Sequence, residues 1–143
     1  KRVRIEKKEL PIDKNVYMYR LNAIYHWTQV VYGNTKKQLR FSFDCAEEVF
    51  DGSTIAYSVL QLATYMGFKE IYLLGADCDY SGAVSHFDGT KAKTSAANGE
   101  IFIKSYQAAK KNLENSDVKI YNATRGGKLE VFPRVEFDEL FHK

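Results

Sequence analysis

A helix, a tight turn and a short apolar strand follow one another in the middle of the sequence. The helix is predicted to begin after Ser53 and Thr54, whose hydroxyl groups can accept hydrogen bonds from the first turn. Its apolar residues recur at helical spacing as one stripe, formed by Ile55, Val59, Leu62, Ala63 and Met66. Gly67 stands where a helix C-cap glycine belongs, and residues 71–75 are nearly all apolar. Such a run suits a central parallel strand covered on both faces, so the pattern predicts an α/β unit.

Weaker patterns on the C-terminal side extend this unit. Residues 99–114 are predicted to form a helix, followed by a short strand at 118–121 and a glycine-containing turn at 122–128. The helix residues expected to face a core are Ile101, Tyr106, Ala109 and Leu113. A final helical turn is expected at 136–142.

The first 40 residues are less regular. Residues 1–10 are compatible with a short edge strand that Pro11 ends, and residues 39–43 alternate as a short strand. Between them, residues 15–32 are ambiguous between strand and helix and contain many aromatic side chains. These are Tyr17, Tyr19, Tyr25, Trp27 and Tyr32. They form either a cover for the core or the interface of a non-catalytic binding module.

Length and charge set the broad class. The chain has 143 residues, so we expect residues 1–143 to form one α/β domain, with residues 41–143 as its clearer part. The net charge is only +3, from 21 basic and 18 acidic residues, which does not indicate a nucleic-acid binder. The chain begins with Lys1 rather than Met. It is therefore either processed or, as we expect, a piece of a longer protein.

Cysteine usage and hydropathy indicate the compartment. Cys45 and Cys78 lack zinc-ligand spacing and fit a reducing cytoplasm, although a disulfide between them remains open. No apolar run approaches about 18 residues, and no signal peptide is visible. We therefore expect no membrane span, and a location in the cytoplasm or at the inner face of the membrane.

The first candidate ligand site is the start of the predicted helix. Gly52, Ser53 and Thr54 stand where free N–H groups and the helix dipole attract anions. Glycine at this position would let a phosphate approach the backbone closely. The alternative interpretation is a simple N-cap, because every helix needs one.

The second candidate site follows the apolar strand. Ligands of open α/β sheets bind outside the carboxyl ends of the strands. Gly75 would admit a ribose or a base at this edge, while Asp77 and Asp79 would bind ribose hydroxyls or a divalent ion. The alternative is that both acids satisfy N–H groups of their own loop.

Two further candidates lie in loops. His86, within Ser85-His86-Phe87, is a candidate general acid or base, or a partner for a phosphate. Arg125 and Lys128, in the turn after the strand at 118–121, are candidate phosphate clamps. The alternatives are an exposed histidine and a glycine turn with solvated charges.

Several of these segments resemble one bacterial and archaeal family. The likeness covers about residues 41–135, and it rests on segments 50–54, 60–63, 66–77, 85–87, 120–124 and 129–132. They resemble the domain-of-unknown-function group 115, also called the 6-hydroxymethylpterin diphosphokinase-like family. More distantly, the helix start and the Ile-Tyr-Leu-x-Gly-x-Asp strand end of residues 71–77 are similar to bacterial sialyltransferases.

The sialyltransferase resemblance implies roles for particular residues. That region helps those enzymes to bind the cytidine monophosphate part of the donor, which implies that Ser53, Thr54, Gly75 and Asp77 contact a nucleotide. Their phosphate-binding tyrosines fall near Tyr80. Their catalytic histidine follows a Ser-His-aromatic triplet, whereas here the only available histidine, His86, lies inside it. Both families also have a Gly-x-Gly-Pro-Ser segment on their first strand, and residues 1–40 do not supply it.

The sequence therefore predicts an α/β protein with a Rossmann-like three-layer fold and a mostly parallel sheet. The leading functional hypothesis is a glycosyltransferase-like protein that uses a nucleotide-sugar donor, such as a CMP-sugar, and a glycan acceptor. The second is diphosphate transfer from ATP to a pterin acceptor, with Mg²⁺ at Asp77 or Asp79. The third is the binding module without catalysis. A homo-oligomer is compatible with each of them.

Overall fold

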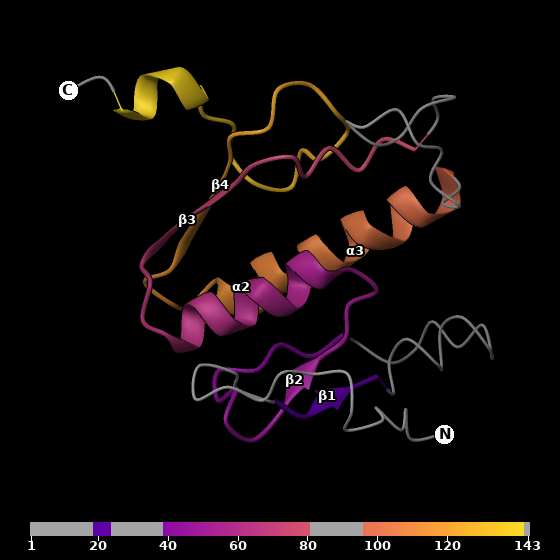
Figure 1. Ribbon diagram of the computed structural model, residues 1–143, viewed down its shortest axis with the longest axis vertical. Coiled ribbons are helices and arrows are strands. Elements are labelled where there is room, and N and C mark those ends of the chain that lie inside the picture. Colours follow the sequence, from indigo (N-terminus) through magenta and orange to yellow (C-terminus); the bar gives the residue numbers. More distant parts are fainter. Residues whose placement is uncertain (1–18, 24–38, 81–95, 142–143) are drawn as a thin grey trace, which may run out of the picture.

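The computed structural model describes residues 19–23, 39–80 and 96–141 (Figure 1). The strands in these residues are β1 (Leu21–Asn22), β2 (Val49–Phe50), β3 (Glu70–Leu73) and β4 (Lys119–Asn122). The helices are α2 (Ile55–Tyr65), α3 (Ala96–Leu113) and the 3-10 helix η1 (Phe137–Phe141). The predicted edge strand at 1–10 and most of the ambiguous segment at 15–32 lie outside the described residues.

The described strands form two separate parallel sheets of two strands each. In one, Leu21 of β1 lies opposite Val49 of β2, and in the other Ile71 of β3 lies opposite Ile120 of β4. In Figure 1 helices α2 and α3 lie between the two sheets. The molecule is therefore of the mixed α/β class, and the pairing in both sheets is parallel.

The two ends of α2 differ in how well the sequence predicts them. Thr54 is the N-cap residue, but its side chain makes no capping hydrogen bond, so that part of the prediction is wrong. The C-terminal prediction is confirmed. Gly67 adopts a φ of +89°, its N–H donates to Thr64 at 3.0 Å, and the Phe68 N–H donates to Ala63 at 3.1 Å. These two bonds satisfy carbonyl groups that the end of the helix leaves without partners.

The apolar stripe predicted for α2 is not the face that the helix buries. Ile55 is 84% exposed and Met66 is 70% exposed, and Val59 is exposed as well. The buried residues of the helix are Tyr57, Ser58, Leu60 and Gln61. A polar residue takes part in the buried face because the Gln61 amide hydrogen-bonds to backbone groups outside the helix.

The predictions for β3 and for residues 39–43 are partly wrong. β3 is parallel, as expected, but only one of its faces is covered, since Tyr72 and Leu74 are exposed. On the open face the Tyr72 ring stacks on Tyr121, with ring centroids 5.1 Å apart. Residues 39–43 form no strand, although Leu39 and Phe41 are buried in the core.

The remaining C-terminal elements are confirmed. Tyr106, Ala109 and Leu113 of α3 are buried in the core, and Ile101 is partly buried. β4 and η1 form where the strand at 118–121 and the last helical turn are predicted. Gly126 and Gly127 both adopt positive φ in the turn after β4, at +70° and +82°.

Candidate functional site

The loops that follow β3 and β4 are joined by backbone and side-chain contacts. The Thr124 hydroxyl oxygen accepts a hydrogen bond from the Ala76 N–H at 3.0 Å. The Lys128 N–H donates to the Asp77 carbonyl at 2.6 Å, and the Lys128 ammonium group lies 2.9 Å from the Asp79 carboxylate. Because β3 and β4 are parallel, both loops lie at the same edge of their sheet. The structure thus brings the second and fourth predicted sites together.

The buried Tyr106 connects this edge with the loop after β2. Its side chain is 2% exposed, and the Thr54 side chain lies near its hydroxyl group. Burial, and then the neighbouring Cys78, raise the pKa of the Tyr106 phenol, Thr54 lowers it, and Tyr80 and Asp77 raise it further. Thr54, Asp77 and Tyr80, which the sequence predicts as separate contacts, therefore all lie near enough to one side chain to affect its pKa.

Ser105, the neighbour of Tyr106, makes the second link to the loop after β2. Its hydroxyl group donates a hydrogen bond of 2.5 Å to the Gly52 carbonyl. The helical spacing of apolar residues predicts Tyr106 only as a core residue. A tyrosine on the buried face of a helix needs a partner for its hydroxyl group, and this requirement is the signal that indicates a further role.

Gly52 has a packing role in addition to its predicted one. A Cβ atom at this position would lie 2.4 Å from the Tyr57 ring, so the ring occupies the space that a side chain would need. The next residue, Ser53, has a φ of +67°, and its N–H donates to the Asp51 carboxylate at 2.8 Å.

A pocket of about 290 Å³ opens at the start of α2. Its lining residues are Tyr19, Leu21, Asp51, Ser53, Thr54, Ile55 and Ser58. The helix dipole favours an anion here, whereas the Asp51 carboxylate opposes it. The predicted anion site is thus a real hollow, with hydroxyl groups and one acid in its wall.

Gly75 is the most open of the predicted contacts. It is exposed, its φ is +74°, and a Cβ atom there would meet nothing within 4 Å. The positive φ explains why glycine stands here, and the open space leaves room for a ligand. Asp77 lies beside it and accepts the Asp79 N–H at 3.1 Å, which is the loop role that sequence analysis gives as the alternative.

The predicted phosphate clamps are both paired with acids. Lys128 pairs with Asp79, and Arg125 pairs with Asp138 at 2.5 Å. The side chains of Arg125 and Asp138 are largely exposed. Exposed ion pairs contribute about 0–1 kcal/mol, so an incoming phosphate can compete for these cations.

The two cysteines are buried and free, and they form no disulfide with each other. Burial, and then the negative charge of Asp77, raise the pKa of the Cys78 thiol to about 11. Burial, and then Asp44, also raise the pKa of Cys45. A thiol that holds its proton so strongly is a poor nucleophile at neutral pH. Cys78 is therefore a structural member of the site.

We expect Cys78 to resist alkylation in the folded protein. At pH 8, a thiol with a pKa of about 11 has about 100-fold less thiolate than a thiol with the ordinary pKa of 9.0. The measurement is iodoacetamide labelling at pH 8, with the Cys78 peptide quantified by mass spectrometry in buffer and in 8 M urea as the control. Equal labelling rates in the two solutions would contradict the buried placement.

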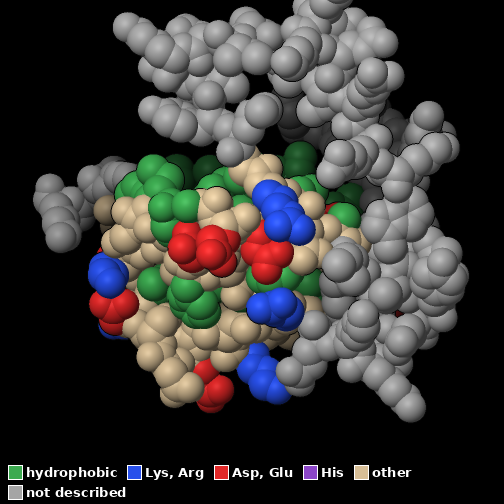
Figure 2. Space-filling model, turned by 90° about the horizontal axis from the view of Figure 1, so that it is seen from below, with side chains coloured by type: hydrophobic (Ala, Val, Ile, Leu, Met, Phe, Trp, Pro, Cys, Tyr) green, Lys and Arg blue, Asp and Glu red, His purple; other side chains and the backbone are tan. Residues whose placement is uncertain are grey.

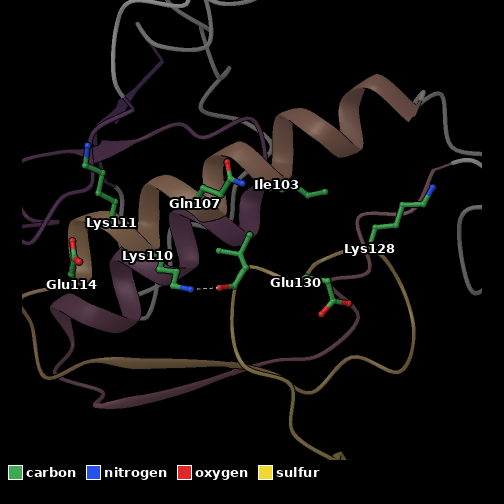
Figure 3. A pocket seen from close by; sticks show the side chains of 8 residues that line it. Ile103, Gln107, Lys110, Lys111, Glu114, Lys128 and Glu130 are labelled. Carbon is green, nitrogen blue, oxygen red and sulfur yellow. Dashed lines mark hydrogen bonds between the residues drawn. The ribbon is translucent and has the colours of Figure 1, made fainter.

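A larger groove, which sequence analysis does not predict, lies beside α3 (Figure 3). Its volume is about 640 Å³, and we call it the α3 groove. Its lining residues are Ile103, Gln107, Lys110, Lys111, Glu114, Lys128, Glu130 and Val131. The Lys110 ammonium group donates to the Val131 carbonyl at 2.9 Å, which connects the helix with the loop after β4.

Other predicted features are not brought into the site. His86, with Ser85 and Phe87, lies outside the described residues. The described segments contain no group of three or more His, Cys, Asp or Glu residues suited to hold a metal ion.

In the described segments neither α-helix is long and apolar enough to cross a membrane. On the face shown in Figure 2, Lys and Arg side chains lie beside Asp and Glu side chains.

The chain was compared with family models, with curated proteins and with solved structures. The sequence matches no family model, and neither a similar curated protein nor a similar solved structure was found.

Proposed function

We propose that this chain binds a nucleotide at the loops that follow β2, β3 and β4, and that it serves a glycosyltransferase-like reaction with a nucleotide-sugar donor. The observation that supports this proposal is that Tyr106 and Ser105 connect the loops after β2 and β3, while the loop after β4 hydrogen-bonds to the loop after β3. The open backbone of Gly75 lies in the loop after β3. Carboxyl ends of parallel strands are the usual ligand edge of α/β proteins. In this proposal the two parallel sheets belong to a Rossmann-like three-layer fold.

Each part of the edge has a distinct role in the proposal. Asp77 accepts hydrogen bonds from ribose hydroxyl groups, and Gly75 leaves room for the sugar or the base. Ser53 and Thr54 hold a phosphate at the start of α2, together with the cations of Lys128 and Arg125. Tyr80 contacts the phosphates, and His86 acts as general acid or base toward the acceptor.

The test is a thermal-shift and calorimetric titration of the protein with CMP, UDP and ATP, each with and without Mg²⁺. We expect CMP to raise the melting temperature without metal, because a ligand that binds only the folded state stabilises it, by about 2.7 kcal/mol at 100 times Kd. A preference for ATP with Mg²⁺ would instead favour diphosphate transfer with the metal at Asp77 and Asp79. Absence of binding at millimolar nucleotide would refute both.

The site itself is tested with Asp77→Asn. Asparagine keeps an oxygen that accepts the Asp79 N–H, so the loop is preserved while the charge is lost. A hydrogen bond to a charged group contributes about 1.5–3 kcal/mol, so we expect the affinity for CMP to fall about 10-fold to 100-fold. The control is Asp117→Asn, since Asp117 precedes β4 and pairs with Lys69 away from the proposed edge. Equal affinity of the Asp77 variant and the wild-type protein would remove Asp77 from the site.

A further inference from the structure

We propose that the α3 groove binds an acidic oligosaccharide, which in the reaction proposed above is the acceptor. This reading as an acceptor rests on the proposed function, whereas binding in the groove does not. The groove shares Lys128 with the strand-end loops, because the Lys128 ammonium group pairs with Asp79 there. A chain lying in the groove would therefore end beside the proposed nucleotide site.

The charges that line the groove favour an anionic ligand with separated charges. Glu130 is neutralised by Arg134, whose guanidinium group donates hydrogen bonds of 2.9, 3.1 and 2.5 Å to its carboxylate. Lys110 donates to a neutral carbonyl and so keeps its full charge. Of the lining residues in the described segments, Glu114 is then the one acid that still opposes the positive charges of Lys110 and Lys111.

The other lining groups point to a sugar rather than to a polymer of uniform charge. Glu114 would repel a ligand with a charge on every unit, but its carboxylate accepts hydrogen bonds from hydroxyl groups. The Gln107 amide both donates and accepts. Among the residues that the structure describes, the lining of the groove has no aromatic side chain on which a base could stack, which disfavours single-stranded nucleic acid. Ile103, Val131 and the lysine stems provide apolar surface for the C–H faces of sugar rings.

The groove is long enough for several sugar units. Its lining on α3 runs from Ile103 to Glu114, which is about 16 Å at 1.5 Å per residue. In the view of Figure 3, Lys111 and Lys128 lie on opposite sides of the groove, with Lys110 between them. The Lys110 ammonium group donates to the Val131 carbonyl. Lysine side chains spaced in this way could pair with the carboxylates of an oligosaccharide in which only some of the sugar units are acidic.

The experiment is calorimetric titration of the full chain with hexagalacturonate, a chain of six acidic sugars, and with maltohexaose as its neutral counterpart. We expect hexagalacturonate to bind and maltohexaose to bind at least 10-fold more weakly. Lys111→Glu should lower the affinity for hexagalacturonate at least 10-fold and leave the affinity for CMP unchanged. The matched control is Lys104→Glu on the same helix, because Lys104 is exposed and does not line the groove.

The outcomes separate this inference from the proposed function. Nucleotide binding without hexagalacturonate binding would overturn the groove as a sugar site and leave the nucleotide site standing. Hexagalacturonate binding without nucleotide binding would uphold the groove and overturn its reading as an acceptor site. Equal losses in the Lys111 and Lys104 variants would overturn the location. Equal or tighter binding of hexaglutamate or of the oligonucleotide dT6 would overturn the assignment to sugars.

Discussion

Replacing Gln61 by leucine should unfold the protein or bring it close to unfolding. Gln61 is 0% exposed, and its amide makes hydrogen bonds at both ends. The carbonyl oxygen accepts the Ser42 N–H at 3.0 Å and the Phe50 N–H at 2.9 Å. The amide nitrogen donates to the Phe50 carbonyl at 2.8 Å and to the Tyr57 carbonyl at 3.1 Å. One side chain thus connects α2 with β2 and with the segment before it.

The size of the effect follows from the backbone groups that leucine would leave unpaired. The Ser42 N–H, the Phe50 N–H and the Phe50 carbonyl would lose the partner that Gln61 provides. Each buried polar group without a partner costs about 1–3 kcal/mol, so their sum approaches the roughly 5–15 kcal/mol that stabilises a typical domain.

The measurement is unfolding in urea, monitored by circular dichroism. Gln107→Leu is the control, because Gln107 is exposed on α3 and a surface change costs about 0.5 kcal/mol or less. If the Gln61 variant unfolded at the same urea concentration as the control, these hydrogen bonds could not be the ones that hold α2 in place.

Gln61 also shows why the buried face of α2 could not be read from the sequence. The stripe of Ile55, Val59 and Met66 is the more apolar face, and hydropathy alone selects it. The structure buries Tyr57, Leu60 and Gln61 instead, since the Gln61 amide satisfies backbone groups 11 and 19 residues away. Such long-range partners leave no periodic signal. Where the signal is local, as at Gly67, the prediction is confirmed.

Residues 39–43 show another reason why a prediction from the sequence pattern can fail. Leu39 and Phe41 are buried and Arg40 between them is exposed, but Ser42 is buried and Phe43 is exposed, so the alternation that predicts a strand stops after Phe41. A strand also needs a neighbouring strand for its backbone groups. Here the Ser42 N–H is satisfied by the Gln61 side chain, and no strand is formed.

In the candidate site, too, the features with a local sequence signal could be predicted, and those that depend on long-range partners could not. Gly75 and Asp77 could be predicted because they stand directly after an apolar strand, where a general rule of α/β folds places ligands. The pairing of Asp79 with Lys128 could not, although sequence analysis names both residues, because they lie 49 positions apart in the numbering. The proximity of Tyr106 to Thr54 could not be predicted either, because these residues are also far apart in the sequence.

Gly127→Ala should be the most damaging small change at the site. A Cβ atom on Gly127 would lie 2.6 Å from both the Cα atom and the carbonyl oxygen of Asp77, so the backbone itself must move. That same carbonyl accepts the Lys128 N–H, and the hydrogen bond would be lost with the displacement. The φ of +82° adds about 1–2 kcal/mol for any residue with a Cβ atom.

Gly126→Ala is the matched control for this change. Gly126 has a similar φ of +70°, but a Cβ atom there would meet nothing within 4 Å, so alanine pays only the conformational cost. Overpacking costs about 1–3 kcal/mol and a lost hydrogen bond about 1 kcal/mol. We therefore expect the Gly127 variant to be roughly 2–4 kcal/mol less stable than the Gly126 variant in urea unfolding.

Nucleotide titration of the same two variants connects this packing with the proposed function. The displaced Asp77 backbone carries the carboxylate that the proposal assigns to the ribose, so the Gly127 variant should also lose affinity for CMP at temperatures where it is still folded. The Gly126 variant should keep it. Equal destabilisation of the two variants would mean that the loop after β4 changes its conformation to accommodate the alanine without disturbing Asp77. In that case the contact between the two loops would not be what fixes the geometry of the strand-end edge.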